Sequence, residues 1–333
     1  MRRIALAAAV SVVVLGQSVA GMAATTLRFA HANNTGEIAT DLYADFARRV
    51  GERSNGELTI QVFPGEQLGK EVELLQQAKA GAIDITASSM PTASTLVPSL
   101  EMPSAPFLWR DWNEAQAIIL SDAMQPAFDE LAEQHNIVPL TKIWYWGWRN
   151  FTFLETEVRE PSDMVDLKLR VPEAPVWVEM VRAFGGAPTP IPFGEVYSAL
   201  QQKVVDGQEN PIPTIYSRKF YEVQGVLSMT RHMLQNNMIL MNQASFDRLS
   251  PELQRILLEE AQKASALNTF IQQGRETAML EDIRASGRVT IIDQPDREAF
   301  GALMQDAYPK MAERWGQENF KRLQEAVAAL RAR

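Results

Sequence analysis

The sequence predicts an α/β protein of two domains, and three observations support this. Segments with the period of a strand alternate with segments that have the period of a helix, beginning at residue 27. The chain has 333 residues, 46% hydrophobic and 22% charged, which is long enough for two globular domains. It contains no cysteine, so buried apolar area must stabilise it without disulfides.

The first 23 residues are expected to be a signal peptide, removed from the mature protein. Arg2 and Arg3 precede an apolar run over residues 4–15, and small residues follow up to Ala23. The apolar run is shorter than the ~20 residues that a membrane-spanning helix needs. We therefore expect cleavage near Ala23 and export of the remaining chain.

The first part of the mature chain reads as alternating strands and helices. Apolar residues four positions apart, at 38, 42, 46 and 50, predict one buried helix face. Residues 57–63 alternate with period two, which indicates a half-buried strand. The expected strands are 27–30, 57–63 and 83–87, and a second helix is expected over 70–80.

The middle and last parts continue the pattern. A strand over 141–148 is expected to carry Trp144, Trp146 and Trp148 on one face, because alternate residues of a strand share a face. A strand over 168–171 and helices over 176–184 and 195–203 follow. Ser250 and Pro251 are a helix start, with serine at the N-cap and proline at the first helical position. That helix is expected to reach about residue 278, long enough to span two domains.

Composition and motifs exclude several classes of function. The net charge of −9 argues against nucleic-acid binding, because phosphate neutralisation supplies most of that affinity. Three scattered histidines and no cysteine predict neither a metal site nor a cofactor. No phosphate-binding, dinucleotide-binding or hydrolase motif is present. An exported α/β chain of this kind favours a solute receptor; an exported enzyme acting on acidic sugars is the alternative.

Four spaced blocks then identify a family resemblance. They are Leu-Lys-Leu-Arg-Val-Pro at 167–172, Phe-Gly-Gly-Ala-Pro-Thr-Pro-Ile-Pro-Phe at 184–193, Glu-Val-Tyr-Ser-Ala-Leu-Gln-Gln at 195–202 and Val-Asp-Gly-Gln-Glu-Asn-Pro at 205–211. In this order they resemble the solute-binding proteins of tripartite ATP-independent periplasmic (TRAP) transporters. The resemblance extends over essentially the whole mature chain.

The resemblance implies a periplasmic receptor with a two-lobed, class II-like binding-protein fold, hinge strands and a long helix that spans both domains. Lobe I is expected at 24–147 plus about 236–275, and lobe II at about 148–235 plus 276–333. The receptor would be a monomer and not an enzyme. It would deliver a small organic acid to the small and large subunits of a sodium-driven membrane permease; a sensor kinase is the alternative partner.

The resemblance also places ligand-binding residues. It assigns the arginine that clamps the ligand carboxylate to Arg170, a second cleft arginine to Arg149 and a polar contact to Asn210. A guanidinium independently suits this role, since its planar fork matches a carboxylate with two parallel hydrogen bonds. Phe193 is expected against the apolar face of the ligand, with a core position as the alternative.

Further positions are weaker candidates for ligand contact. They are Glu71, Ser89, Glu173 and Asn237, together with His31 and Asn33 after the first strand and Trp148 as a stacking surface. A carboxylate in a closed cleft would repel a second ligand carboxylate and accept hydrogen bonds from hydroxyl groups. The expected ligand is therefore a hydroxylated monoacid such as a uronate or another sugar acid. A C4-dicarboxylate is the alternative.

Overall fold

The computed structural model describes residues 24–332, and its strands form one mixed sheet. The predicted signal peptide, residues 1–23, lies outside the described residues. The strands are β1 (Thr25–Ala30), β2 (Leu58–Phe63), β3 (Ile85–Ser89), β4 (Ile137–Thr141), β5 (Tyr145–Phe153), β6 (Lys168–Val171), β7 (Ala187–Pro190), β8 (Gly207–Pro211), β9 (Val226–Asn242) and β10 (Thr290–Ile292). Their order is β2-β1-β3-β9-β5-β8-β6-β7, and β4 and β10 also pair with β9.

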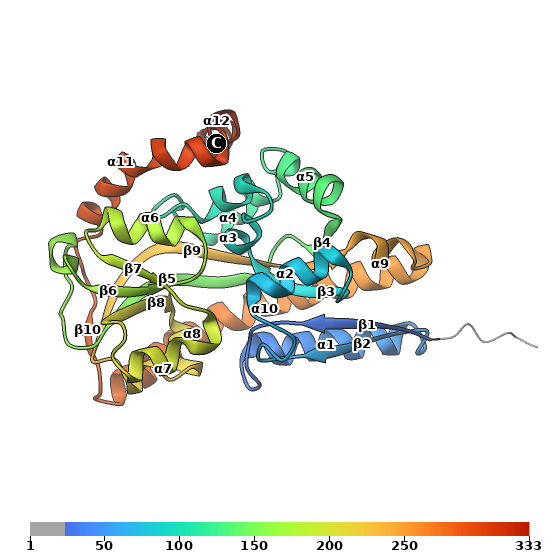
Figure 1. Cartoon of the computed structure of the whole chain (residues 1–333), viewed down its shortest axis with the longest axis horizontal. Coiled ribbons are helices and arrows are strands. Elements are labelled where there is room, and N and C mark those ends of the chain that lie inside the picture. Colours follow the sequence, from blue (N-terminus) through green and yellow to red (C-terminus); the bar gives the residue numbers. More distant parts are fainter. Residues whose placement is uncertain (1–23, 333) are drawn as a thin grey trace, which may run out of the picture.

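Helices pack around this sheet (Figure 1). They are α1 (Ile38–Arg53), α2 (Glu71–Ala80), α3 (Met90–Ala93), α4 (Trp112–Ile119), α5 (Gln125–His135), α6 (Pro175–Ala183), α7 (Val196–Gln201), α8 (Ile212–Ser217), α9 (Gln243–Asp247), α10 (Pro251–Ala285), α11 (Arg297–Trp315) and α12 (Gln317–Arg331). None of the helices within 24–332 has an apolar stretch long enough to cross a membrane.

The first lobe consists of β1–β3 with α1 and α2. The strands β1 and β2 run parallel, as do β1 and β3, and α1 packs against them. The buried residues of α1 include Leu42, Phe46 and Val50, as the four-residue spacing predicts. Figure 1 shows this group of elements at one end of the molecule.

The second lobe consists of β6–β8 with α6–α8. Here β6 lies between β7 and β8 and runs parallel to both. The 17-residue strand β9 joins the lobes: its last residues pair with β3 and β4, and its first residues pair with β5 and β10. The helix α10 also crosses the molecule and contacts α1 in one lobe and α8 in the other (Figure 1).

Two expected elements differ in extent. The helix α10 begins where predicted, with Ser250 accepting the N-cap hydrogen bond from Leu253, but it continues to Ala285. The single strand expected over 141–148 is two strands, β4 and β5. The register of β5 shifts around Gly147, whose φ of 126° only glycine adopts readily.

This shift separates the three tryptophans expected on one face. Trp144 and Trp146 belong to the core of the first lobe, where Trp144 stacks on Tyr43 with the ring centroids 4.6 Å apart. Trp148 belongs instead to the larger core that also contains Trp177. The expectation of one tryptophan face is therefore wrong, because the irregularity at Gly147 interrupts the strict alternation of a strand.

We predict that Gly147→Ala destabilises the protein. The added Cβ would lie 2.9 Å from Cβ of Pro211, in a left-handed backbone conformation, at a cost of about 1–3 kcal/mol. The control is Gly274→Ala in α10, where a Cβ meets nothing within 4 Å and helix propensity rises. Thermal unfolding should show a lower midpoint for the first variant and an equal or higher one for the second. Equal midpoints for Gly147→Ala and the wild type would contradict this role.

Candidate functional site

A cavity lies between the two lobes, at the ends of several strands. Such edges collect ligand-binding groups in α/β folds. Its lining consists of Ala32, Asn33, Glu71, Ala87, Ser89, Trp146, Arg149, Arg170, Pro172, Trp177, Phe193, Asn210, Gln235 and Asn237. Most residues predicted from the sequence as ligand contacts are therefore brought together here, although they come from both lobes and from the joining strands.

Arg170 on β6 is buried with one part of its guanidinium unpaired. Its side chain is 2% exposed, and Nε and Nη2 both donate to the carbonyl oxygen of Ile191, at 2.9 and 2.7 Å. Its Nη1 has no hydrogen-bond partner among residues 24–332. Burial, and secondly the nearby charge of Arg149, lowers the pKa of Arg170 to about 9. The group stays charged at neutral pH and would be stabilised by an anion in the cavity.

Arg149 on β5, by contrast, is paired within the protein. It forms a buried ion pair with Glu209 of β8 through Nε and Nη2, and its Nη1 donates to Gln235. Glu209 in turn contacts Nε2 of the buried His232, at 3.2 Å. Burial alone would raise the pKa of Glu209, but Arg149 and the His232 hydrogen bond lower it overall. The charge of Arg149 is thus paired directly, whereas among residues 24–332 no carboxylate lies in ion-pair contact with Arg170.

The other polar residues of the lining are held by short networks. Glu71, at the start of α2, accepts hydrogen bonds from the backbone N–H of Ser89 at 2.9 Å and from the hydroxyl of Ser88 at 3.2 Å. Gln235 donates to Asn237 at 2.8 Å, and Asn210 donates to Gln208 at 2.6 Å. These partners fix the side chains in place, which reduces the entropy lost when they contact a ligand.

Three predicted residues lie outside the lining. His31 is buried beside Phe29 and Tyr43, and its Nδ1 accepts a hydrogen bond from the backbone N–H of Asn33 at 3.2 Å. Trp148 packs in the core, with the guanidinium of Arg231 over its ring at 5.5 Å. Glu173 follows the cavity residue Pro172, but its own side chain is not part of the lining.

Three further aromatic or polar side chains line the cavity, beyond the residues predicted as ligand contacts. Trp146 occupies the position expected for Trp148, because the register shift at Gly147 changes which tryptophan faces the cleft. Trp177 on α6 lines the cavity, and its indole Nε1 has no hydrogen-bond partner within the described chain. Gln235 on β9 is the third. No local motif marks Trp177 or Gln235, whereas Trp146 belongs to the alternating tryptophans at 144, 146 and 148. Within residues 24–332 no three His, Asp or Glu side chains gather as metal ligands.

Comparison with known proteins identifies the class. The sequence model of the protein family described as bacterial extracellular solute-binding protein, family 7, matches residues 29–314. The chain belongs to this family, the solute receptors of TRAP transporters, and the predicted resemblance and two-lobed fold are confirmed. Members of the family are periplasmic binding proteins.

Relatives with known ligands are similar over nearly the whole chain. The sialic acid-binding periplasmic protein of Vibrio cholerae is 31% identical, over 92% of this chain and 95% of its own. A TRAP solute-binding protein from Roseobacter denitrificans with bound β-D-glucuronate is 29% identical, with a TM-score of 0.85 over 91% of this chain and 99% of that one. A Sulfurospirillum deleyianum protein with bound succinate is 27% identical, with a TM-score of 0.84 over 90% and 98%.

We predict that His31 makes stability depend on pH. Burial lowers the pKa of His31 to about 4, whereas unfolded histidine titrates near 6.5. Between these values the unfolded state binds more protons, so the free energy of unfolding falls as pH decreases, by at most ~3 kcal/mol. His31→Gln, which keeps a hydrogen-bond acceptor, should lose less stability than the wild type between pH 7 and 4. Parallel pH profiles of the two proteins in urea unfolding would refute this assignment.

Proposed function

We propose that the protein is a periplasmic receptor for a hydroxylated monocarboxylic acid, a uronate or an aldonate, and that Arg170 clamps the carboxylate. The observation that carries the proposal is the unpaired Nη1 of Arg170 in a cavity where Arg149 is already compensated. One buried, uncompensated guanidinium matches one carboxylate, which it can bind through two parallel hydrogen bonds.

The remainder of the lining supports a ligand rich in hydroxyl groups. The carboxylate of Glu71 has capacity to accept hydrogen bonds beyond those from Ser88 and Ser89, and it disfavours a second ligand carboxylate. Asn210 and Asn237 each carry an amide that donates and accepts. Trp146, Trp177 and Phe193 offer aromatic faces to the C–H groups of a sugar chain or ring.

The proposal also states where the receptor acts and to which membrane partner it delivers its ligand. Residues 1–23 would direct export to the periplasm and be removed there, and the loaded receptor would transfer its ligand to the small and large subunits of a sodium-driven TRAP permease. The receptor would bind as a monomer and return the acid chemically unchanged. The two lobes would close around the ligand, since closure removes water and strengthens each polar contact.

We predict that Arg170→Ala abolishes most of the affinity. Truncating one partner of a buried, hydrogen-bonded charge pair costs about 2–5 kcal/mol, which corresponds to roughly 30-fold to several-thousand-fold in Kd. Arg170→Lys should recover only part, because an ammonium cannot form the bidentate fork. The control is Arg182→Ala on the exposed side of α6. Calorimetry with near wild-type affinity for Arg170→Ala would place the carboxylate elsewhere in the cavity.

We predict that sugar acids stabilise the protein more than dicarboxylates do. A ligand at about 1,000 times its Kd stabilises by roughly 4 kcal/mol, enough to raise the melting temperature by several degrees. The panel should contain D-glucuronate, D-galactonate, succinate and malate, and mass spectrometry should recover each ligand unchanged. If only succinate and malate raise the melting temperature, the monoacid assignment is wrong. A chemically converted ligand would favour the enzyme alternative.

A further inference from the structure

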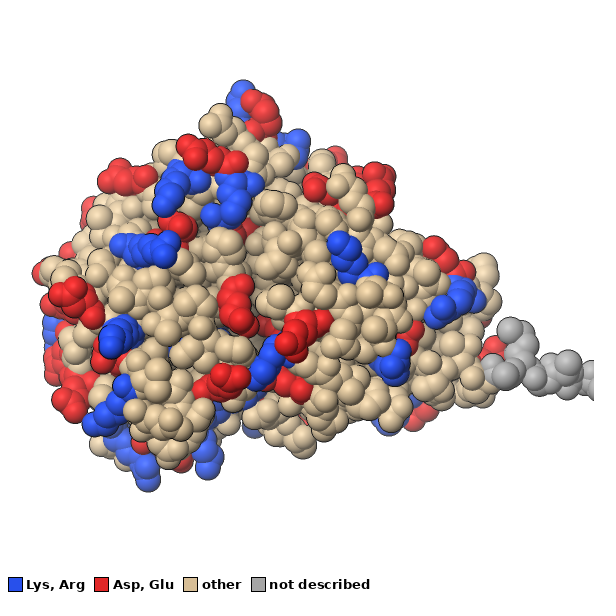
Figure 2. Space-filling model, in the orientation of Figure 1, with Lys and Arg blue, Asp and Glu red and all other residues tan. Residues whose placement is uncertain are grey.

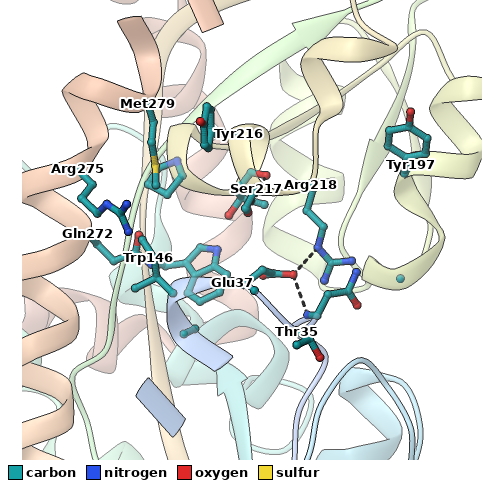
Figure 3. Close-up of a pocket in the computed structure, with 17 residues that line it drawn as sticks. Thr35, Glu37, Trp146, Tyr197, Tyr216, Ser217, Arg218, Gln272, Arg275 and Met279 are labelled. Carbon is teal, nitrogen blue, oxygen red and sulfur yellow. Dashed lines mark hydrogen bonds and ion pairs between the residues drawn. The ribbon is translucent and has the colours of Figure 1, made fainter. Parts of the chain in front are cut away.

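An ion pair joins the two lobes directly beside the cavity. Glu37 stands between β1 and α1 in the first lobe, and Arg218 follows α8 in the second. Nε of Arg218 lies 2.7 Å from Oε1 of Glu37, and both side chains are only 7% exposed (Figure 3). The pair therefore depends on the lobes being close together, because its two partners are attached to different lobes.

Glu37 and Arg218 also contact residues that line the cavity. Asn33 donates from Nδ2 to the second oxygen of Glu37, at 3.0 Å. Arg218 donates to the carbonyl oxygen of Ala32 at 3.1 Å, and its guanidinium lies 4.0 Å from the ring centroid of Phe193. Asn33, Ala32 and Phe193 all line the cavity, so the ion pair braces the lining from both lobes at once.

On its other side the pair borders a second pocket. Glu37 and Arg218 line a pocket of about 440 Å³, which is also lined by residues of α8 and α10; of these, Tyr216, Ser217, Gln272, Arg275 and Met279 are labelled in Figure 3. Trp146 lines both this outer pocket and the cavity. Together with Trp146, the ion pair thus stands between the cavity and the outer pocket.

A second contact between the lobes differs in its exposure. Lys70 of the first lobe lies 2.7 Å from Glu195 of the second, with side chains 34% and 54% exposed. An exposed pair of this kind contributes little, since water solvates both charges whether or not they meet. A buried pair differs, because losing one partner leaves the other charge without compensation in a water-poor site.

We propose that the Glu37–Arg218 ion pair is a latch that positions Asn33 and Phe193 and slows release of the bound acid. The proposal rests on the proposed function, since it requires a ligand that the lobes enclose. Opening the cleft separates Glu37 from Arg218, and water then solvates both. The latch consequently acts on the closed state and on the dissociation rate, and not on which acid is recognised.

The test measures the dissociation rate of D-glucuronate and D-galactonate by stopped-flow tryptophan fluorescence. Glu37→Gln removes the charge but keeps an oxygen acceptor for Asn33, and it should raise the dissociation rate about 10- to 100-fold. Glu195→Gln makes the same chemical change in the exposed pair and should alter the rate less than threefold. Circular dichroism and the melting temperature without ligand check that each variant is folded.

A double variant separates a latch from two independent effects. The double variant Glu37→Gln/Arg218→Gln leaves no uncompensated charge at this position. The dissociation rate of the double variant should therefore not exceed that of the faster of its two single variants, Glu37→Gln and Arg218→Gln. Multiplied effects, or a Glu37→Gln rate within threefold of the wild type, would overturn the latch while the binding function stands. A wild-type protein that binds no acid of the panel would refute the proposed function and the latch with it.

Discussion

The burial of two guanidinium groups beneath one cavity is the constraint around which this structure is organised. A charge removed from water must be compensated, and the protein compensates Arg149 and Arg170 differently. Arg149 pairs with the carboxylate of Glu209 and donates to the side-chain oxygen of Gln235. Both contacts require β8 and β9 to be neighbours of β5. Within residues 24–332, Arg170 donates hydrogen bonds only to the carbonyl oxygen of Ile191. This asymmetry distinguishes a structural arginine from one that can bind a ligand.

The strand β9 and the helix α10 join the lobes and so hold the two arginines at the cavity between them. The strand β9 is continuous through both halves of the sheet, so the lobes are linked by backbone hydrogen bonds and not by a loose linker. The helix α10 runs alongside and contacts both. In the proposed closure, cavity residues on β9 and β5 would keep their positions in the linkage, while those carried by β6, α2 and the loops would move with their lobes onto the first set.

Local sequence patterns predicted what depends on local interactions. The spacing of Leu42, Phe46 and Val50 predicted the buried face of α1, and Ser250-Pro251 marked the start of α10. The positions of Arg170 and Asn210 came from recognisable blocks around strand ends. The tryptophans were placed wrongly, because a register shift at Gly147 is a property of strand pairing that the chain's alternation does not reveal.

The sequence also did not predict which residues form ion pairs with Arg149 and with Arg218. Glu209, 60 residues from Arg149, stands in the same block as Asn210, but nothing in that block states which arginine it will meet. Glu37 and Arg218 are each ordinary polar residues near a helix end, and only the packing of the lobes makes them a buried pair. Such pairs arise from topology, so the sequence blocks marked Arg170, the proposed carboxylate clamp, more readily than the residues that pair with the other buried charges.

The overall charge favours the cleft as the place where the proposed acid would be recognised. The protein carries a net charge of −9, and side chains of both signs are interspersed over the face seen in Figure 2. Surface charges act only over about 8 Å at physiological ionic strength, so the exterior offers an acid little attraction. In a closed, water-poor cavity the same Coulomb interaction is several times stronger. The proposed affinity for an anion would therefore depend on closure, and the proposed latch, Glu37 and Arg218, would hold that closed state from a neighbouring pocket.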